Sequence, residues 1–138
     1  MLFSRDKAPA WGLLIALLLC FILNDHVFKN IIARPRPYIA LQGVSYVGGI
    51  AKPSGYSFPS GHAANGMAAA MGFFFLTKSK WRYALVTLAV LIGLSRVYLK
   101  VHYLTDVGAG FLLGVGVAFV ASLLVRGWYA RGRKRRRR

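Results

Sequence analysis

The sequence predicts an all-α, integral-membrane protein, a bundle of about four transmembrane helices, and three observations support this fold class. Hydrophobic residues make up 57% of the 138 positions. Four stretches carry almost no charge, and a helix needs about 20 residues to cross a bilayer, so four spans would use about 80 residues. The remainder is too short for a separate soluble domain, and a soluble bundle of this length would leave such stretches uncovered. The stretches are Trp11–Phe28, His62–Leu76, Trp81–Leu94 and Val107–Val125.

The first stretch is expected to be a span that stays on the chain. Arg5 and Lys7 precede it, as basic residues precede the apolar part of a signal peptide. No cleavage site of small residues follows, because the chain continues with Asn24, Asp25 and His26. We therefore expect one transmembrane domain over residues 1–130 and a basic tail over residues 131–138.

The connection from Asn30 to Phe58 is rich in Pro and Gly, which break helices, so we expect an irregular loop over one face of the bundle. Small residues occur in the second and fourth stretches and favour close helix contact, either within the chain or between copies. They include Ala63, Ala64, Gly66 and Ala68, and Gly108, Gly110, Gly114 and Gly116.

The charge distribution predicts the topology. The sequence contains nineteen Lys and Arg residues but only three acidic residues. If the tail is cytoplasmic, thirteen of the basic residues lie on the cytoplasmic side, as the positive-inside rule requires. The six outside are Lys29, Arg34, Arg36, Lys52, Arg96 and Lys100. The basic run of the tail, residues 131–138, could also bind nucleic acid, but because it follows a span it is better explained as a topology anchor that binds anionic lipid headgroups. We expect a multi-pass protein of the inner (plasma) membrane.

Alternating spans bring four polar segments to the same, non-cytoplasmic face. These segments are the end of the first span, the start of the second, the end of the third and the start of the fourth. We therefore expect the active site on the periplasmic or extracellular side.

Pro59-Ser60-Gly61-His62 is typical of a helix start, with Ser60 as the N-cap. The free N–H groups and the positive dipole end of such a start form an anion site. Pro53-Ser54-Gly55-Tyr56 is similar, but it lacks the histidine and a following helix, so we interpret it as loop.

The basic side chains suit a phosphate. Arg36 and Arg96 offer planar forks that match phosphate oxygens, Lys29 adds a point charge, and Arg34 competes with Arg36 as the ligand. Carboxylates are too scarce to hold magnesium, so we expect a mechanism with no metal and no cofactor.

The histidines supply the reactive groups. His102 and Asp106 are four residues apart, hence on one helix face if the fourth helix begins before them. A carboxylate that accepts one ring N–H fixes the tautomer and leaves the other nitrogen free to attack a phosphorus atom. His62 would be the general acid. His26 and Asp25 have no such neighbours and are expected to be structural.

Lys29-x6-Arg36-Pro37, Pro59-Ser60-Gly61-His62 and Ser95-Arg96-x5-His102-x3-Asp106 together resemble the type-2 phosphatidic acid phosphatase family, which is related to vanadium-dependent haloperoxidases. The resemblance implies a phosphohistidine on His102, with His62 as acid and Asp106 as the orienting residue. It also implies phosphate binding by Lys29, Arg36, Ser60, Gly61, His62 and Arg96. Members commonly have six spans, so this chain corresponds to an N-terminally truncated six-helix core or to a minimal member.

The predicted function is a metal-independent lipid phosphatase acting on phosphate or pyrophosphate headgroups. Candidate substrates are undecaprenyl pyrophosphate, phosphatidylglycerol phosphate, phosphatidic acid and lipid A. The alternative is a lipid phosphotransferase that uses the same site. A vanadate-binding haloperoxidase is disfavoured by the four spans, and a non-catalytic lipid-binding protein is disfavoured by the complete set of site residues.

Overall fold

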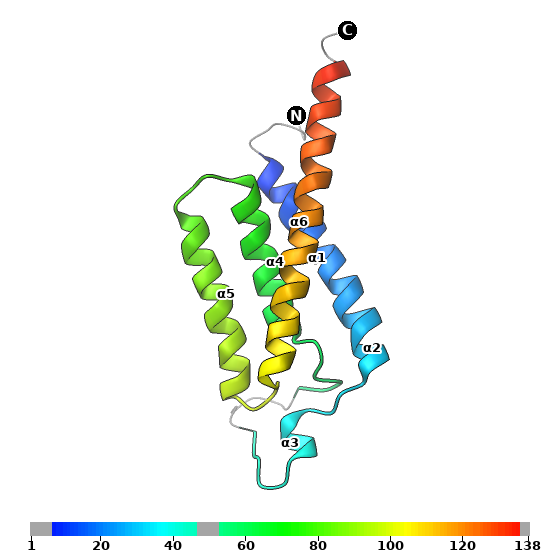
Figure 1. Cartoon of the computed structure of the whole chain (residues 1–138), viewed down its shortest axis with the longest axis vertical. Coiled ribbons are helices and arrows are strands. Elements are labelled where there is room, and N and C mark those ends of the chain that lie inside the picture. The colour runs from blue at the N-terminus through cyan, green and yellow to red at the C-terminus, as the bar shows by residue number, and fades with distance from the viewer. Residues whose placement is uncertain (1–6, 47–52, 136–138) are drawn as a thin grey trace.

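The computed structural model describes residues 7–46 and 53–135, and all regular structure within these ranges is helical. Arg5, Lys52 and residues 136–138 of the predicted tail lie outside the described residues. In chain order the elements are α1 (Ala8–Phe21), the π-helix η2 (Ile22–Phe28), α2 (Lys29–Ile32), α3 (Pro37–Ala40), α4 (Gly61–Leu76), α5 (Trp81–Tyr98) and α6 (Leu104–Arg135). α1, η2 and α2 follow one another without a break, and with α4, α5 and α6 they form an elongated helical bundle (Figure 1). The predicted all-α fold is confirmed.

The helices match the predicted spans in position, but the predicted number of spans is confirmed only in part. Two segments, Ala8–Ala40 and Leu104–Gly132, are long and apolar enough to cross a membrane. α4 and α5 have 16 and 18 residues and do not pass the same test. α6 extends to Arg135, so residues 131–135 of the predicted tail continue this helix.

The packing of the bundle is that of a membrane protein. Its interior consists largely of small side chains, whereas large apolar side chains point outward, with Leu112 76% and Leu18 59% exposed. Such a surface would be unfavourable in water and suits contact with lipid. The buried core includes Ala16, Cys20, Ala63, Ala64, Ala68, Ala118 and Ala121.

The most extensive helix contact joins α4 to α6, and glycine lets their main chains approach closely. A Cβ atom on Gly110 would lie 2.7 Å from the Ser60 carbonyl oxygen, and one on Gly114 would lie 2.5 Å from the Ala64 carbonyl oxygen. Of the two open explanations for these small residues, packing within the chain therefore holds at Gly110 and Gly114. Cβ atoms on Gly108 and Gly116 would meet nothing within 4 Å.

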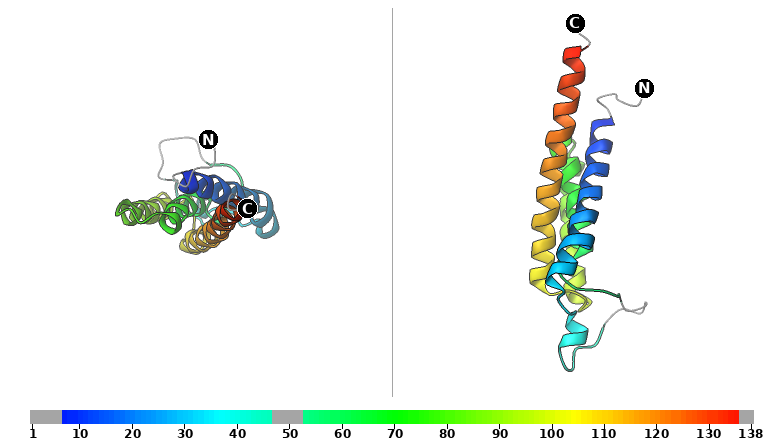
Figure 2. Two further views of the ribbon diagram at one scale, coloured as in Figure 1. Left: turned by 90° about the horizontal axis from the view of Figure 1, so that it is seen from above. Right: turned by 90° about the vertical axis from the view of Figure 1, so that its right-hand side faces the viewer.

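The start of α1 and the end of α6 lie at one end of the bundle, and α3 lies at the other (Figures 1 and 2). Within its described residues, 30–46 and 53–58, the long connection is irregular apart from α2 and α3, and Gly43 and Gly55 adopt positive φ angles of 75° and 77°, which glycine tolerates well. The start of α4 and the start of α6 meet at this end, where the Ser60 N–H donates to the Asp106 carbonyl at 3.0 Å.

Candidate active site

The residues that the sequence singles out lie at the end of the bundle that carries α3. Lys29 begins α2, Ser60 and Gly61 stand at the start of α4, and Arg96 lies in the last turn of α5. Asp106 lies in the first turn of α6. The structure thus brings the four polar segments of the sequence together.

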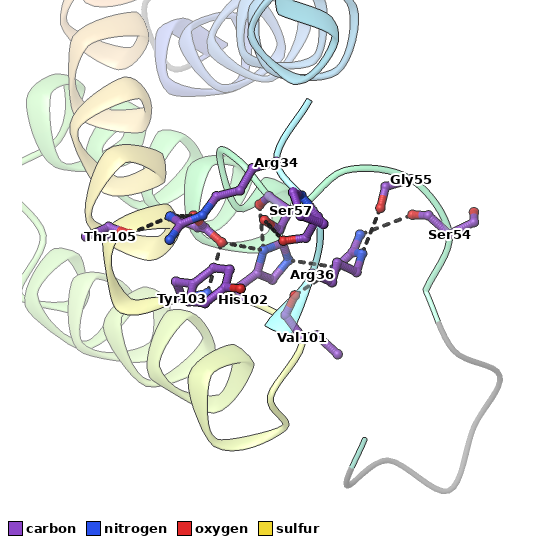
Figure 3. A network of polar contacts seen from close by, with 11 residues as sticks. Arg34, Arg36, Ser54, Gly55, Ser57, Val101, His102, Tyr103 and Thr105 are labelled. Atoms are coloured by element: carbon purple, nitrogen blue, oxygen red, sulfur yellow. Dashed lines mark hydrogen bonds and ion pairs between the residues drawn. The ribbon is translucent and has the colours of Figure 1, made fainter. Parts of the chain in front are cut away.

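The His102 ring is held by a main-chain carbonyl (Figure 3). Its Nδ1 atom lies 2.7 Å from the Ser57 oxygen and 3.7 Å from Asp106 Oδ2. Because a carbonyl oxygen only accepts, Nδ1 carries the proton, and in the neutral ring Nε2 has a free lone pair. Nε2 faces Arg36 Nη1 at 3.4 Å, and the residue is only 5% exposed.

The position of His102 relative to α6 differs from the expectation. α6 begins at Leu104, so His102 lies before the helix and does not share a helix face with Asp106. Instead, the end of α5 is closed by main-chain bonds from Val101 and His102 to the Arg96 carbonyl, and this turn directs the ring toward the carboxylate. That Asp106 orients His102 stays a prediction.

Asp106 is fully buried and bound on both oxygens. Oδ2 accepts the Tyr103 N–H at 2.9 Å, and Oδ1 accepts Arg34 Nη1 at 2.7 Å. The Arg34 guanidinium also donates to Thr105 Oγ1 at 2.8 Å and lies 3.7 Å from the centre of the Tyr103 ring. Of the two arginines that compete for the phosphate in the sequence, Arg34 is therefore the one paired with the carboxylate.

Arg36 is 5% exposed and joins two segments of the site. Its Nε and Nη2 groups donate to the carbonyls of Gly55 and Ser54 at 3.0 and 3.1 Å, and Nη1 donates to the Val101 carbonyl at 3.1 Å. The segment similar to the α4 start is indeed irregular, as expected, but its carbonyl oxygens hold Arg36 in place beside His102 (Figure 3).

The start of α4 offers main-chain N–H groups with a lysine beside them. Ser60 occupies the predicted N-cap position, but its hydroxyl makes no capping bond, and this buried oxygen has no partner among the described residues. Lys29 Nζ pairs with Asp25 and would lie 3.7 Å from a Cβ atom on Gly61. Asn24 Nδ2 would lie 3.3 Å from the same atom, so the absence of a side chain at Gly61 lets η2 approach the helix start.

His62 is exposed at the edge of this cluster. Lys29, Arg36, Arg96 and His102 lie within electrostatic reach of His62, so positive charge predominates at this end of the bundle. Such a concentration of positive charge favours the binding of an anion.

Three contributions to this site were not predicted. The Asp25 carboxylate binds Lys29, a contact that the four-residue spacing on a helix could have indicated. The ion pair between Arg34 and Asp106 and the acceptor role of the Ser57 carbonyl join residues far apart in the chain. A main-chain carbonyl has no residue-type signature, so no sequence signal points to Ser57.

Comparisons with known proteins find a matching family model and several relatives. A sequence model of the PAP2 superfamily matches residues 9–130. The chain is 34% identical to an undecaprenyl-diphosphatase of Sulfolobus acidocaldarius over 88% of this chain and 57% of the relative. It spans roughly half the length of such curated relatives, with 49% of a phosphatidylglycerophosphatase B of Bacillus subtilis covered.

Two solved structures have the same fold. The crystal structure of Aquifex aeolicus LpxE aligns with a TM-score of 0.74 at 30% identity, covering 87% of this chain and 70% of that chain. The crystal structure of a transmembrane PAP2-type phosphatidylglycerolphosphate phosphatase from Bacillus subtilis aligns with a TM-score of 0.62 at 34% identity, covering 86% and 58%.

Proposed function

The chain belongs to the PAP2 superfamily, and on this premise we propose that it is a lipid phosphatase that removes a phosphate group from the headgroup of a membrane lipid. The observation that carries the proposal is the His102 ring, whose Nδ1 proton is held by Ser57 while Nε2 faces the Arg36 guanidinium. A buried nucleophile beside a fixed cation suits attack on a phosphoryl group.

The proposed reaction has two steps. The His102 Nε2 lone pair attacks phosphorus, the bond from phosphorus to the lipid oxygen breaks, and His62 gives its proton to that oxygen. Water then attacks the phosphorus of the phosphohistidine while His62 takes a proton from the water, the bond from phosphorus to Nε2 breaks with return of the electron pair to His102, and inorganic phosphate leaves. Lys29, Arg36, Arg96, the Ser60 hydroxyl and the Gly61 N–H would bind the phosphoryl oxygens and balance their charge. Asp106 would stabilise the orientation of His102.

The charged groups of the site act only on the phosphate, so they favour a class of substrate and not one lipid. Undecaprenyl pyrophosphate, phosphatidylglycerol phosphate, phosphatidic acid and lipid A all present a phosphate on an apolar anchor. In a phosphotransferase, an acceptor hydroxyl would replace water in the second step.

We also propose that the site faces the periplasm or the cell exterior and that the basic C-terminal end lies in the cytoplasm, near anionic lipids. The position of the C-terminal end of α6 at the end of the bundle opposite α3 supports this topology, as does the excess of basic residues there. Green fluorescent protein fused to the C-terminus should fluoresce in cells, whereas fusion to a periplasmic phosphatase should be inactive. The reverse result would contradict the topology.

The function is tested by measuring phosphate release from each of the four lipids in detergent with EDTA present. We expect release from at least one lipid, undiminished by EDTA, and no release by His102→Gln. Turnover that depends fully on added magnesium would refute the metal-independent mechanism, and turnover by the variant would remove His102 as the nucleophile. Transfer of the phosphoryl group to an added alcohol in place of water would establish a phosphotransferase.

A further inference from the structure

We propose that Arg34 is a positioning residue that fixes the Asp106 carboxylate and the Ser57 carbonyl around His102, and that it does not bind the phosphate. The effect of Arg34 on turnover rests on the proposed function, whereas its effect on the position of the His102 ring does not. The pattern of basic residues alone leaves Arg34 and Arg36 as competing phosphate ligands, and the contacts distinguish them.

The side chain of Arg34 is already engaged. Nη1 has two hydrogens, and it donates to Thr105 Oγ1 at 2.8 Å and to Asp106 Oδ1 at 2.7 Å. One face of the guanidinium is covered by the Tyr103 ring, whose centre lies 3.7 Å away. These contacts hold the planar group against the start of α6 and commit Nη1 to the buried carboxylate.

The main chain of the same residue holds the other acceptor near His102 Nδ1. The Arg34 carbonyl accepts the Ser57 N–H at 2.8 Å, and Ser57 Oγ donates to the neighbouring Pro35 carbonyl at 3.2 Å. The Ser57 carbonyl in turn lies 2.7 Å from Nδ1. Arg34 thus fixes, through two different groups, both oxygens that surround the ring nitrogen.

Loss of the guanidinium would leave a buried negative charge without its partner. The Asp106 side chain is fully buried, and Arg34 forms the one Arg or Lys ion pair with it within residues 7–46 and 53–135. An unpaired buried carboxylate is costly, and the His102 Nδ1–H, which the Ser57 carbonyl accepts, lies only 3.7 Å from Oδ2. We expect the carboxylate to turn toward Nδ1 and to pull the ring away from the Ser57 carbonyl.

The first experiment observes His102 directly and needs no turnover. The chain has three histidines, so selective ¹⁵N labelling in detergent micelles gives few ring signals, and the His102 Nδ1–H signal is the one missing from His102→Gln. We compare Arg34→Gln, Arg34→Lys and Arg36→Gln with Arg82→Gln, a matched control. Arg82 also lies against an aromatic ring, 4.7 Å from the centre of Phe74, but at the start of α5, far from the site.

We expect the Nδ1–H signal to move in Arg34→Gln, to move less in Arg34→Lys, which keeps the positive charge, and to stay in place in Arg82→Gln. An unchanged signal in Arg34→Gln would overturn the proposal. Titration of inorganic phosphate, followed on the ring signals, should give an affinity within about 2-fold of the wild type for Arg34→Gln and at least about 10-fold weaker for Arg36→Gln, which loses a direct charge-assisted bond. Equal weakening by both variants would identify Arg34 as a phosphate ligand and overturn the proposal.

The second experiment measures turnover of the lipid that the wild type hydrolyses. Arg34→Gln should lower kcat by about 100-fold with KM nearly unchanged, because a displaced nucleophile affects the chemical step and not the binding of phosphate. A raised KM with an unchanged kcat would contradict the positioning role. If the wild type released no phosphate from any lipid, the proposed function would fail, while the signal of His102 would still decide the role of Arg34.

Discussion

Gly110→Ala tests whether the contact between α4 and α6 sets the geometry of the site. The new Cβ atom would lie 2.7 Å from the Ser60 carbonyl oxygen and 3.1 Å from both Ala63 Cβ and the Ala64 nitrogen. None of these atoms belongs to the end of a flexible side chain. Since non-bonded atoms pack at 3.5–4.0 Å, α4 would have to move away from α6 by about 1 Å.

This movement of α4 would displace groups of the proposed active site. The Ser60 N–H donates to the Asp106 carbonyl at 3.0 Å, only four residues before Gly110 in α6, so separation of the helices pulls the start of α4 away from the carboxylate. Misplacement of reacting groups by about 1 Å costs about 100-fold in rate, and overpacking costs about 1–3 kcal/mol of stability. We expect Gly110→Ala to lose between about 10-fold and 100-fold in kcat and to unfold at a lower temperature.

Phosphate release and thermal unfolding in the same detergent measure both effects. Gly108→Ala and Gly116→Ala are the matched controls, since a methyl group at either position meets nothing within 4 Å and alanine favours the helix. Both controls should keep the wild-type rate and stability or gain slightly in stability. Wild-type kcat in Gly110→Ala, or a loss of the same size in Gly108→Ala, would refute the link between helix separation and catalysis.

Two further predictions concern the charged groups. Asp106→Asn should retain about 1% of the phosphatase rate while His102→Gln retains none, because the Ser57 carbonyl still holds Nδ1–H at 2.7 Å; equal rates in the two variants would show that this carbonyl does not maintain the tautomer. Asp25→Asn removes a negative charge beside Lys29 and Gly61, so inhibition by inorganic phosphate should tighten by about 3- to 10-fold, whereas Lys29→Met should weaken it. Weaker inhibition in Asp25→Asn would instead mean that Asp25 holds Lys29 in the position needed for binding.

The helices and the location of the site follow from the sequence to a large extent. Charge-free stretches separated by Pro, Gly and basic residues mark where the helices lie, and alternating direction places Lys29, Ser60, Arg96 and Asp106 at one end. The spacing of His102 and Asp106 does not say where α6 begins, because a turn and a helix can present the same two side chains to each other.

The different hydrogen-bond partners of the two arginines could not be predicted from the sequence either. Arg34 and Arg36 have the same side chain and stand two residues apart in an irregular segment, so no periodicity separates their directions. What separates them is the acceptor that each one reaches: a carboxylate for Arg34, and the carbonyls of Ser54, Gly55 and Val101 for Arg36. Carbonyl acceptors depend on the path of the main chain and are not encoded by residue type.

Substitutions at inward-facing small residues and at outward-facing large residues should have different effects. Reaction geometry depends on how closely main chains approach at positions such as Gly110 and Gly114, where every added atom displaces a helix. The outward leucines, among them Leu18 and Leu112, are more than half exposed, so a change in their size alters mainly the lipid-facing surface and leaves the close contact between α4 and α6 in place.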